Sequence, residues 1–282
     1  MALTEEQRKK LANLRSVVEQ QMKEIEEKPD EVWRPAEKTL AYYTSMDYWY
    51  PKVKQVKEIR TPETIRVPVP DGCDLFRLLD YGTKIYKEPL HYHEFLDSLR
   101  QAASKIGVPC FLRSGQTSDK HDWIHSCYVQ DIEKIYENLC CIVNLSGMAD
   151  LHVDVFYVRR MIPTKPIFTF FEGMPITREF RFKLEGNEIT HVQPYWLDKA
   201  FEDSEPSAYT SDMRDSLREI SILSTHEFFE LKDLTLKLRN VLPDFDWSVD
   251  WLQDKNGNWW LTDMARAEHS YWWQPDFKVV EG

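Results

Sequence analysis

The chain has 282 residues, of which 42% are hydrophobic and 13% aromatic, enough to bury the core of one large domain or two modest ones. Acidic residues exceed basic ones by 11, which disfavours general affinity for nucleic acids or anionic membranes, since both need a basic surface. The five cysteines are odd in number and none has CxxC spacing, as is typical of reduced thiols. No stretch approaches the ~18 apolar residues of a membrane span. We therefore expect a cytoplasmic protein without membrane attachment.

The first part of the chain divides into a helix and a mixed segment. Apolar residues recur at helical spacing over residues 11–25, which predicts an amphipathic helix within residues 1–30. This helix could pack on its own domain or pair with a partner helix. Residues 31–105 are then expected to form an N-terminal subdomain, with a final helix over 92–106.

The remaining residues, 106–282, mix strands with helices and place hairpins in the second half. Strands are predicted at 108–113, 140–143, 153–161, 177–184, 189–195, 246–252 and 259–264. A short helix is predicted over 132–139 and one long helix over 213–238. The order is that of an α+β fold and not of a doubly wound sheet.

A polar loop follows the strand that ends at Arg113. It runs through Ser118 to Lys120 and combines backbone N–H groups, hydroxyls and two cations, which are the groups that a triphosphate needs. The GxxxxGK[ST] spacing of a Walker A loop is absent. A solvated surface turn would explain the same residues equally well.

Two further stretches place arginines on strands. Arg159 and Arg160 end an apolar strand and point to opposite faces, so one could contact a base or phosphate while the other is solvated. Surface arginines paired with acidic neighbours are the simpler alternative. Glu179, Arg181 and Lys183 share one face of a later strand. That face is either solvated or the wall of a polar cleft that contacts phosphate.

Two aspartates on the last pair of strands are the most informative residues. Asp250 and Asp263 each lie among apolar residues, and a turn around Gly257 would bring them side by side. Paired carboxylates inside apolar strands are costly unless a cation or hydrogen bonds neutralise them. Mg²⁺ takes one or two carboxylates together with substrate phosphates. Two hydrogen-bonded structural aspartates are the alternative.

Taken in order, these segments resemble the ATP-grasp superfamily and in particular the cell-division-cycle protein 123 family. The segments that carry the resemblance are Arg113–Lys120 with Trp123, Val158–Met161, Glu179–Arg181 with Val192–Gln193, and the strands of Asp250 and Asp263 around Gly257. The resemblance implies an α+β, ATP-grasp-like fold in which two α+β subdomains with antiparallel sheets enclose the nucleotide. Residues 106–282 would then be the nucleotide-binding region.

The resemblance also implies ATP and Mg²⁺ as cofactors and gives each matching residue a role. The cofactor-binding residues that it implies are Arg113, Ser118, Lys120, Arg160, Met161, Ile162 and Arg181. The segment 160–162 would contact adenine, largely through its backbone. Lys120 and Arg181 would be catalytic, with Arg181 beside the γ-phosphate. Asp250 and Asp263 would hold the magnesium ion.

The sequence departs from the family pattern at three places. Arg113 stands where the family has a lysine, and an arginine keeps the charge and adds bidentate donors. Ala265 stands where the family has a metal-binding asparagine, so the two aspartates, or a shifted group such as Glu268, would have to carry the metal. The aromatic tail 266–273 has no counterpart and is either an acceptor site or core packing.

The resemblance implies two functions. The first is an ATP-dependent ligase that joins a carboxylate to an amine or similar nucleophile through an acylphosphate, with an unidentified acceptor substrate. The second is an ATP-binding assembly factor or chaperone with little or no turnover and a protein partner. Ala265 favours the second, because weakened metal binding slows phosphoryl transfer. A nucleic-acid ligase is disfavoured, because the Lys-x-Asp-Gly motif is absent from the chain.

Overall fold

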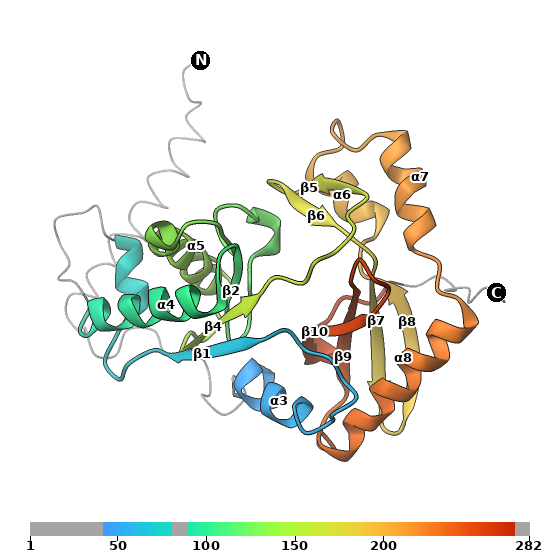
Figure 1. Ribbon diagram of the computed structural model, residues 1–282, viewed down its shortest axis with the longest axis horizontal. Coiled ribbons are helices and arrows are strands. Elements are labelled where there is room, and N and C mark those ends of the chain that lie inside the picture. The colour runs from blue at the N-terminus through green and yellow to red at the C-terminus, as the bar shows by residue number, and fades with distance from the viewer. Residues whose placement is uncertain (1–41, 81–88, 274–282) are drawn as a thin grey trace, which may run out of the picture. The chain divides into compact units, whose positions relative to one another are not determined.

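Two antiparallel four-stranded sheets organise the protein (Figure 1). The computed structural model describes residues 42–80 and 89–273, all within one of the two units into which the chain divides, Thr39–Gly282. The helix predicted within residues 1–30 lies outside the described residues. In spatial order the first sheet contains β1 (Thr64–Pro68), β4 (Val155–Arg160), β2 (Cys110–Ser114) and β3 (Tyr128–Val129). In spatial order the second contains β10 (Trp259–Arg266), β9 (Trp247–Gln253), β7 (Glu179–Glu185) and β8 (Glu188–Pro194).

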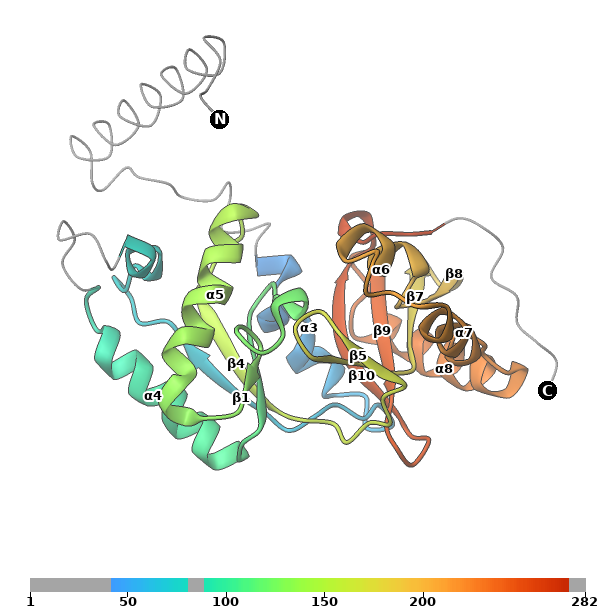
Figure 2. The ribbon, with the colours of Figure 1, turned by 90° about the horizontal axis from the view of Figure 1, so that it is seen from above.

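Helices α4 (Tyr92–Ile106) and α5 (Ile135–Met148) cover the first sheet. Figure 2 shows both of them on the side of that sheet away from β7–β10. The helix predicted over 92–106 is confirmed with the same bounds, because its apolar residues form a single buried stripe. Gly107 ends it at a φ of 86°, a conformation that favours glycine.

The strand predicted at 140–143 is wrong, because these residues belong to α5. A short apolar run fits a buried helix as well as a strand, and only the surrounding pattern separates the two. Leu139, Ile142, Val143 and Ser146 are all buried, and their spacing is helical. The predicted short helix therefore continues through this segment.

Alternation along β7 separates the apolar core of the second layer from its charged face. Phe180, Phe182 and Leu184 are fully buried in a core shared with α3 (Met46–Val53) and α8 (Thr225–Lys237). Glu179, Arg181 and Lys183 occupy the opposite face, as the two-residue period of a strand requires. Three charged side chains thereby meet on one face of the sheet.

The single long helix predicted over 213–238 is two helices, α7 (Ser211–Ile220) and α8. Ser224 interrupts the pattern as the N-cap of α8, where its hydroxyl accepts from the backbone N–H of Glu227 and the Glu227 carboxylate accepts from the N–H of Ser224. This reciprocal capping box starts a new helix inside a continuous apolar periodicity.

A small hairpin and a third core connect the two layers. The hairpin is formed by β5 (Phe168–Phe170) and β6 (Met174–Ile176), and it packs with α6 (Asp198–Ser204) around Phe171 and Phe201. These elements were not among the sequence predictions. Short 3₁₀ segments lie at Leu75–Asp80, Lys120–Asp122, Ile132–Lys134, Leu238–Asn240 and Ala267–His269. Across the described ranges, no helix is both long and apolar enough to cross a membrane.

The predicted domain boundaries at residues 30 and 105 stay predictions. Strand β1 precedes residue 105 and pairs with β4, which follows it. Helix α4 contacts both strands. The N-terminal subdomain and the following region thus contribute strands to the same sheet.

Removal of the capping carboxylate should cost stability in a pH-dependent way. Burial alone would raise the pKa of Glu227, but hydrogen bonds from Arg178 and Ser224 lower it to about 2. A depressed folded pKa stabilises the protein above the unfolded value of about 4.3, and this contribution is lost as the pH falls toward 2. Glu227→Gln should cost about 1 kcal/mol at pH 7 in urea unfolding and clearly less at pH 3.

The control for this substitution is Glu230→Gln, which changes an exposed carboxylate on the same helix. It should change the free energy of unfolding by less than about 0.5 kcal/mol. Equal losses for the two variants, or a loss at position 227 that does not depend on pH, would contradict this account of the cap.

Candidate functional site

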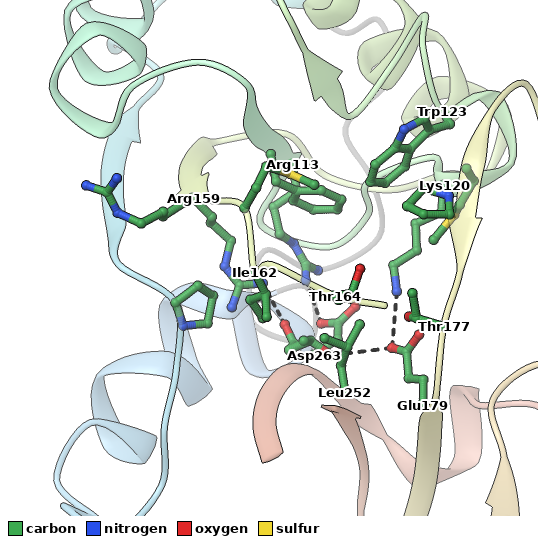
Figure 3. A pocket seen from close by; sticks show the side chains of 17 residues that line it. Arg113, Lys120, Trp123, Arg159, Ile162, Thr164, Thr177, Glu179, Leu252 and Asp263 are labelled. Atoms are coloured by element: carbon green, nitrogen blue, oxygen red, sulfur yellow. Dashed lines mark hydrogen bonds and ion pairs between the residues drawn. The ribbon is translucent and has the colours of Figure 1, made fainter. Parts of the chain in front are cut away.

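A pocket opens where the two sheets and the β5–β6 hairpin meet (Figure 3). Its apolar walls are Phe111, Trp123, Met161, Ile162, Met174 and Leu252. Its charged residues are Arg113, Lys120, Arg159, Arg160, Glu179 and Asp263. An apolar cleft with a few convergent charged groups is the usual form of a ligand site.

Arg113 reaches from the first sheet to the second. Its Nη1 donates to Oδ1 of Asp263 at 2.6 Å, while its Nε donates to the carbonyl of Ser114 at 3.1 Å. Arg113 is 2% exposed, so the guanidinium is held in place by both contacts. Burial would raise the pKa of the Asp263 carboxyl, but Arg113 and the neighbouring cations lower it. Asp263 is therefore a carboxylate at neutral pH.

Arg159 is the second buried guanidinium of the pocket. On β4 it points inward and is 4% exposed, whereas the side chain of Arg160 is 53% exposed and pairs with Glu63. Nη1 of Arg159 donates to the carbonyl of Thr262 at 2.6 Å. Burial and the like charge of Arg113 lower the pKa of Arg159 to about 10, so it remains protonated at pH 7 but is destabilised by its surroundings.

Lys120 and Glu179 form a buried ion pair at the other end of the pocket. The Nζ–Oε1 distance is 3.5 Å, and the Glu179 side chain is 1% exposed. Burial alone would lower the pKa of Lys120, but Glu179 outweighs it and raises that pKa. Burial raises the pKa of Glu179, and Lys120 offsets only part of that rise. The pair is stable only while both charges stay together.

The pocket holds more buried positive charge than negative charge. Arg113, Arg159 and Lys120 face two carboxylates, Glu179 and Asp263. Within residues 42–80 and 89–273, Nη2 of Arg159 has no hydrogen-bond partner, and neither does Oε2 of Glu179. Buried polar atoms are normally paired, so two orphans in one pocket indicate a ligand with both acceptor and donor groups.

The sequence suggested that backbone N–H groups of the polar loop after Arg113 are available to bind a triphosphate, and three of them are not. The N–H of Gly115 donates to the Val155 carbonyl at 3.0 Å, and those of Gln116 and Thr117 donate to Oγ of Ser114 at 3.3 and 3.0 Å. These amides are thus already used within the fold. The loop also carries Lys120, which lines the pocket.

Arg181 and Asp250 lie beside this pocket, not in it. Asp250 is 3% exposed and accepts from Nε and Nη2 of Arg181 at 2.8 and 2.9 Å. The Tyr195 ring separates this pair from the pocket, with Lys120 Nζ 4.5 Å and Arg181 Cζ 4.9 Å from its centroid. Arg181 lines a second cleft, together with His121, Lys199 and Tyr195.

The residues proposed for magnesium do not fit a metal site. Asp250 and Asp263 are paired across β9 and β10, which confirms that the hairpin brings them side by side. Each carboxylate, however, is engaged by a guanidinium. Ala265 supplies no ligand, and no cluster of three His, Cys, Asp or Glu side chains suited to a metal ion occurs in the described part of the chain.

The structure brings most of the predicted cofactor-binding residues together. Those that line the pocket are Arg113, Lys120, Arg160, Met161, Ile162 and, from the predicted metal pair, Asp263. Ser118 is buried and lies outside the set of lining residues, as do Arg181 and Asp250. Two lining residues, Arg159 and Glu179, were considered in the sequence but not assigned to the site. Alternation from Arg160 places Arg159 on the inner face, and this signal was available in the sequence.

Comparison with known proteins gives a likeness in fold. No protein-family model matches the sequence, and no curated protein matches it either. C-terminally truncated Cdc123 from Schizosaccharomyces pombe is similar in structure, with a TM-score of 0.52 and 14% identity over 83% of this chain and 87% of that one. Cdc123 from the same organism aligns with a TM-score of 0.51, 14% identity and the same coverage. The chain has the fold of Cdc123.

At this identity the likeness to Cdc123 concerns the fold alone. It confirms the predicted α+β architecture with antiparallel sheets and the likeness in fold to Cdc123. D-alanine–D-alanine ligase from Bacillus anthracis complexed with ATP aligns with a TM-score of 0.40 and 9% identity, over 80% of this chain and 55% of that one. What the pocket binds therefore has to be argued from its own residues.

The Lys120–Glu179 pair should show strong coupling in a double-mutant cycle. Lys120→Met or Glu179→Leu leaves one buried charge without its partner and should cost about 3 kcal/mol of unfolding free energy. The double variant should lose much less than the sum, because apolar side chains can replace a buried ion pair. Losses that simply add, measured by denaturant unfolding, would show that the two charges do not depend on each other.

Proposed function

We propose that the protein binds ATP in the pocket between its two sheets, with the phosphates against Arg113, Arg159 and Lys120. The excess of buried positive charge carries this proposal. Guanidinium groups bind phosphate oxygens through bidentate, charge-assisted hydrogen bonds. A phosphate on the unpartnered Nη2 of Arg159 would also relieve the repulsion between Arg159 and Arg113.

The apolar walls of the pocket suit a nucleoside. The hinge 160–162 crosses between the sheets, and its backbone can contact adenine as the family resemblance implies. Trp123 offers a planar indole and Met174 an apolar thioether side chain, and Oε2 of Glu179 can accept from an amino or hydroxyl group. The cavity measures about 90 Å³, well below the 300–1,000 Å³ that is typical of ligand pockets. Its walls must therefore move apart when the nucleotide binds.

The proposed role of the nucleotide is to be held, with little or no turnover. Phosphoryl transfer normally relies on metal ions that bridge the phosphate oxygens. The carboxylates that would hold such ions, Asp250 and Asp263, are engaged by Arg181 and Arg113. A protein that retains ATP can use it to stabilise a conformation that a protein partner recognises.

The second candidate is an ATP-dependent ligase that joins a carboxylate to an amine, and the cleft behind Tyr195 favours it. That cleft has a volume of about 350 Å³ and is lined by Arg181 and Lys199, which could bind a carboxylate. It also includes Tyr271 from the aromatic tail that the sequence suggested as an acceptor site. Arg181 and Lys120 share the Tyr195 ring, so an acceptor there would lie next to the nucleotide pocket.

Incubation with ATP, Mg²⁺ and a panel of amino acids and carboxylic acids separates the two candidates. We expect ATP to be recovered intact by chromatography, with no ADP above the level in buffer. ADP formation that rises with one added acid or amine, and that is lost in Arg181→Met, would contradict retention of the nucleotide and establish the ligase.

Arg159 and Arg160 form a matched pair for testing the phosphate site. Arg159→Met should weaken ATP binding about tenfold or more, because a buried charge-assisted hydrogen bond is lost. Arg160→Met should change the Kd by less than about threefold, because the Arg160 side chain is exposed and paired with Glu63. Calorimetry measures both values, and an equal effect of the two substitutions would contradict the assignment.

A further inference from the structure

We infer that the pocket takes ATP without a magnesium ion, because anchored guanidinium groups occupy the positions beside the carboxylates that a metal would need. This inference rests on the proposed function, since it concerns the form of the nucleotide in that same pocket. In this account Asp250 and Asp263 are the counter-charges of arginines and not metal ligands.

Three of the four carboxylate oxygens of the two aspartates already accept hydrogen bonds. Oδ1 of Asp263 accepts from Arg113 at 2.6 Å and from the N–H of Met264 at 2.9 Å. Both oxygens of Asp250 accept from Arg181, and Asp250 is 3% exposed. A magnesium ion could bind Asp250 only by displacing Arg181, and on Asp263 it would lie beside the positive charge of Arg113.

Separating a buried guanidinium group from its carboxylate would cost considerable free energy. The backbone carbonyl of Ser114 holds Arg113, and the carbonyl of Thr262 holds Arg159. Arg113 is 2% exposed, so separation from Asp263 would leave a buried cation without a counter-charge. Breaking a buried pair in this way is strongly destabilising.

A metal would also lack a complete set of protein ligands. Ala265 follows Asp263 at the next position on the same side of β10, and a methyl group coordinates nothing. Mg²⁺ requires near-octahedral oxygen ligands and gives up its waters reluctantly. The two buried arginines and the half-buried Lys120 supply the positive charge that the phosphates need, and no metal is required for that purpose.

This arrangement predicts the direction in which magnesium changes the affinity for ATP. Magnesium in solution neutralises part of the phosphate charge and competes with Arg113 and Arg159 for the same oxygens. Magnesium should therefore weaken the binding of ATP, whereas a true Mg-ATP site would bind only in its presence. Asp263 competes with the phosphates for Arg113, so its neutralisation should strengthen binding.

Calorimetric titration of ATP into the full chain, in excess EDTA and in excess MgCl₂, tests the inference. We expect the Kd in EDTA to be lower, by about three- to tenfold. Binding that is equally tight or tighter in MgCl₂ would overturn the metal-free site and leave the proposed function standing. No binding in either buffer would overturn both, so the two failures are distinguishable.

Two carboxylate substitutions sharpen the result. In EDTA, Asp263→Asn should bind ATP more tightly than the wild type, by about three- to tenfold, because the competing charge on Arg113 is gone. Glu63→Gln removes the same charge from the exposed pair with Arg160 and should have a smaller effect. Loss of binding in Asp263→Asn, with the fold intact by circular dichroism, would overturn the inference. If that variant does not fold, the comparison of EDTA with MgCl₂ on the wild type decides.

Discussion

The packing of the two sheets depends on one type of interaction. Buried guanidinium groups on the first sheet donate hydrogen bonds to β10, the last strand of the second sheet. Arg113 contacts the Asp263 carboxylate and Arg159 contacts the Thr262 carbonyl, at adjacent positions of β10. Each contact removes water from a charged group, so it stabilises the fold only when the geometry of its hydrogen bonds is held rigidly. Strands β2 and β4 pair so that Arg113 lies opposite Tyr157 and Arg159 opposite Phe111, which places the two arginines diagonally on one face of the sheet.

The chemistry of the pocket follows from this arrangement. Two like charges placed side by side repel each other, and only one carboxylate faces them, so the floor of the pocket retains positive charge. Lys120 adds a third cation but brings its own counter-ion in Glu179. A polyanion is the ligand that such a pocket accommodates most favourably. The apolar walls and the hinge then favour a nucleotide over a free phosphate.

Much of the fold could be predicted from local pattern. The alternation along β7 and the turns at Gly186 and Gly257 are strong signals, and both hairpins occur as predicted. Two errors came from segments where one pattern serves two structures. The apolar run at 140–143 belongs to a buried helix, and the capping box at Ser224 divides what periodicity alone joins. The β5–β6 hairpin has strands of three residues each, too short for an alternating pattern.

The site was less predictable, because it depends on contacts between residues far apart in the sequence. The adjacency of Asp250 and Asp263 follows from a hairpin and could be predicted. Their engagement by Arg181 and Arg113 could not, since it depends on how strands of different hairpins and sheets pack. An acidic pair that reads as a metal site in the sequence is, in the structure, the counter-charge of two arginines.

The most direct test of the central claim is the dependence of affinity on phosphate. Adenosine and ATP would be titrated into the same protein by calorimetry in one EDTA buffer. If buried positive charge in excess of the carboxylates binds the ligand, ATP should bind at least about tenfold more tightly than adenosine, since each charged contact contributes over 1 kcal/mol. Equal affinity for the two ligands, or no binding of ATP, would contradict the account.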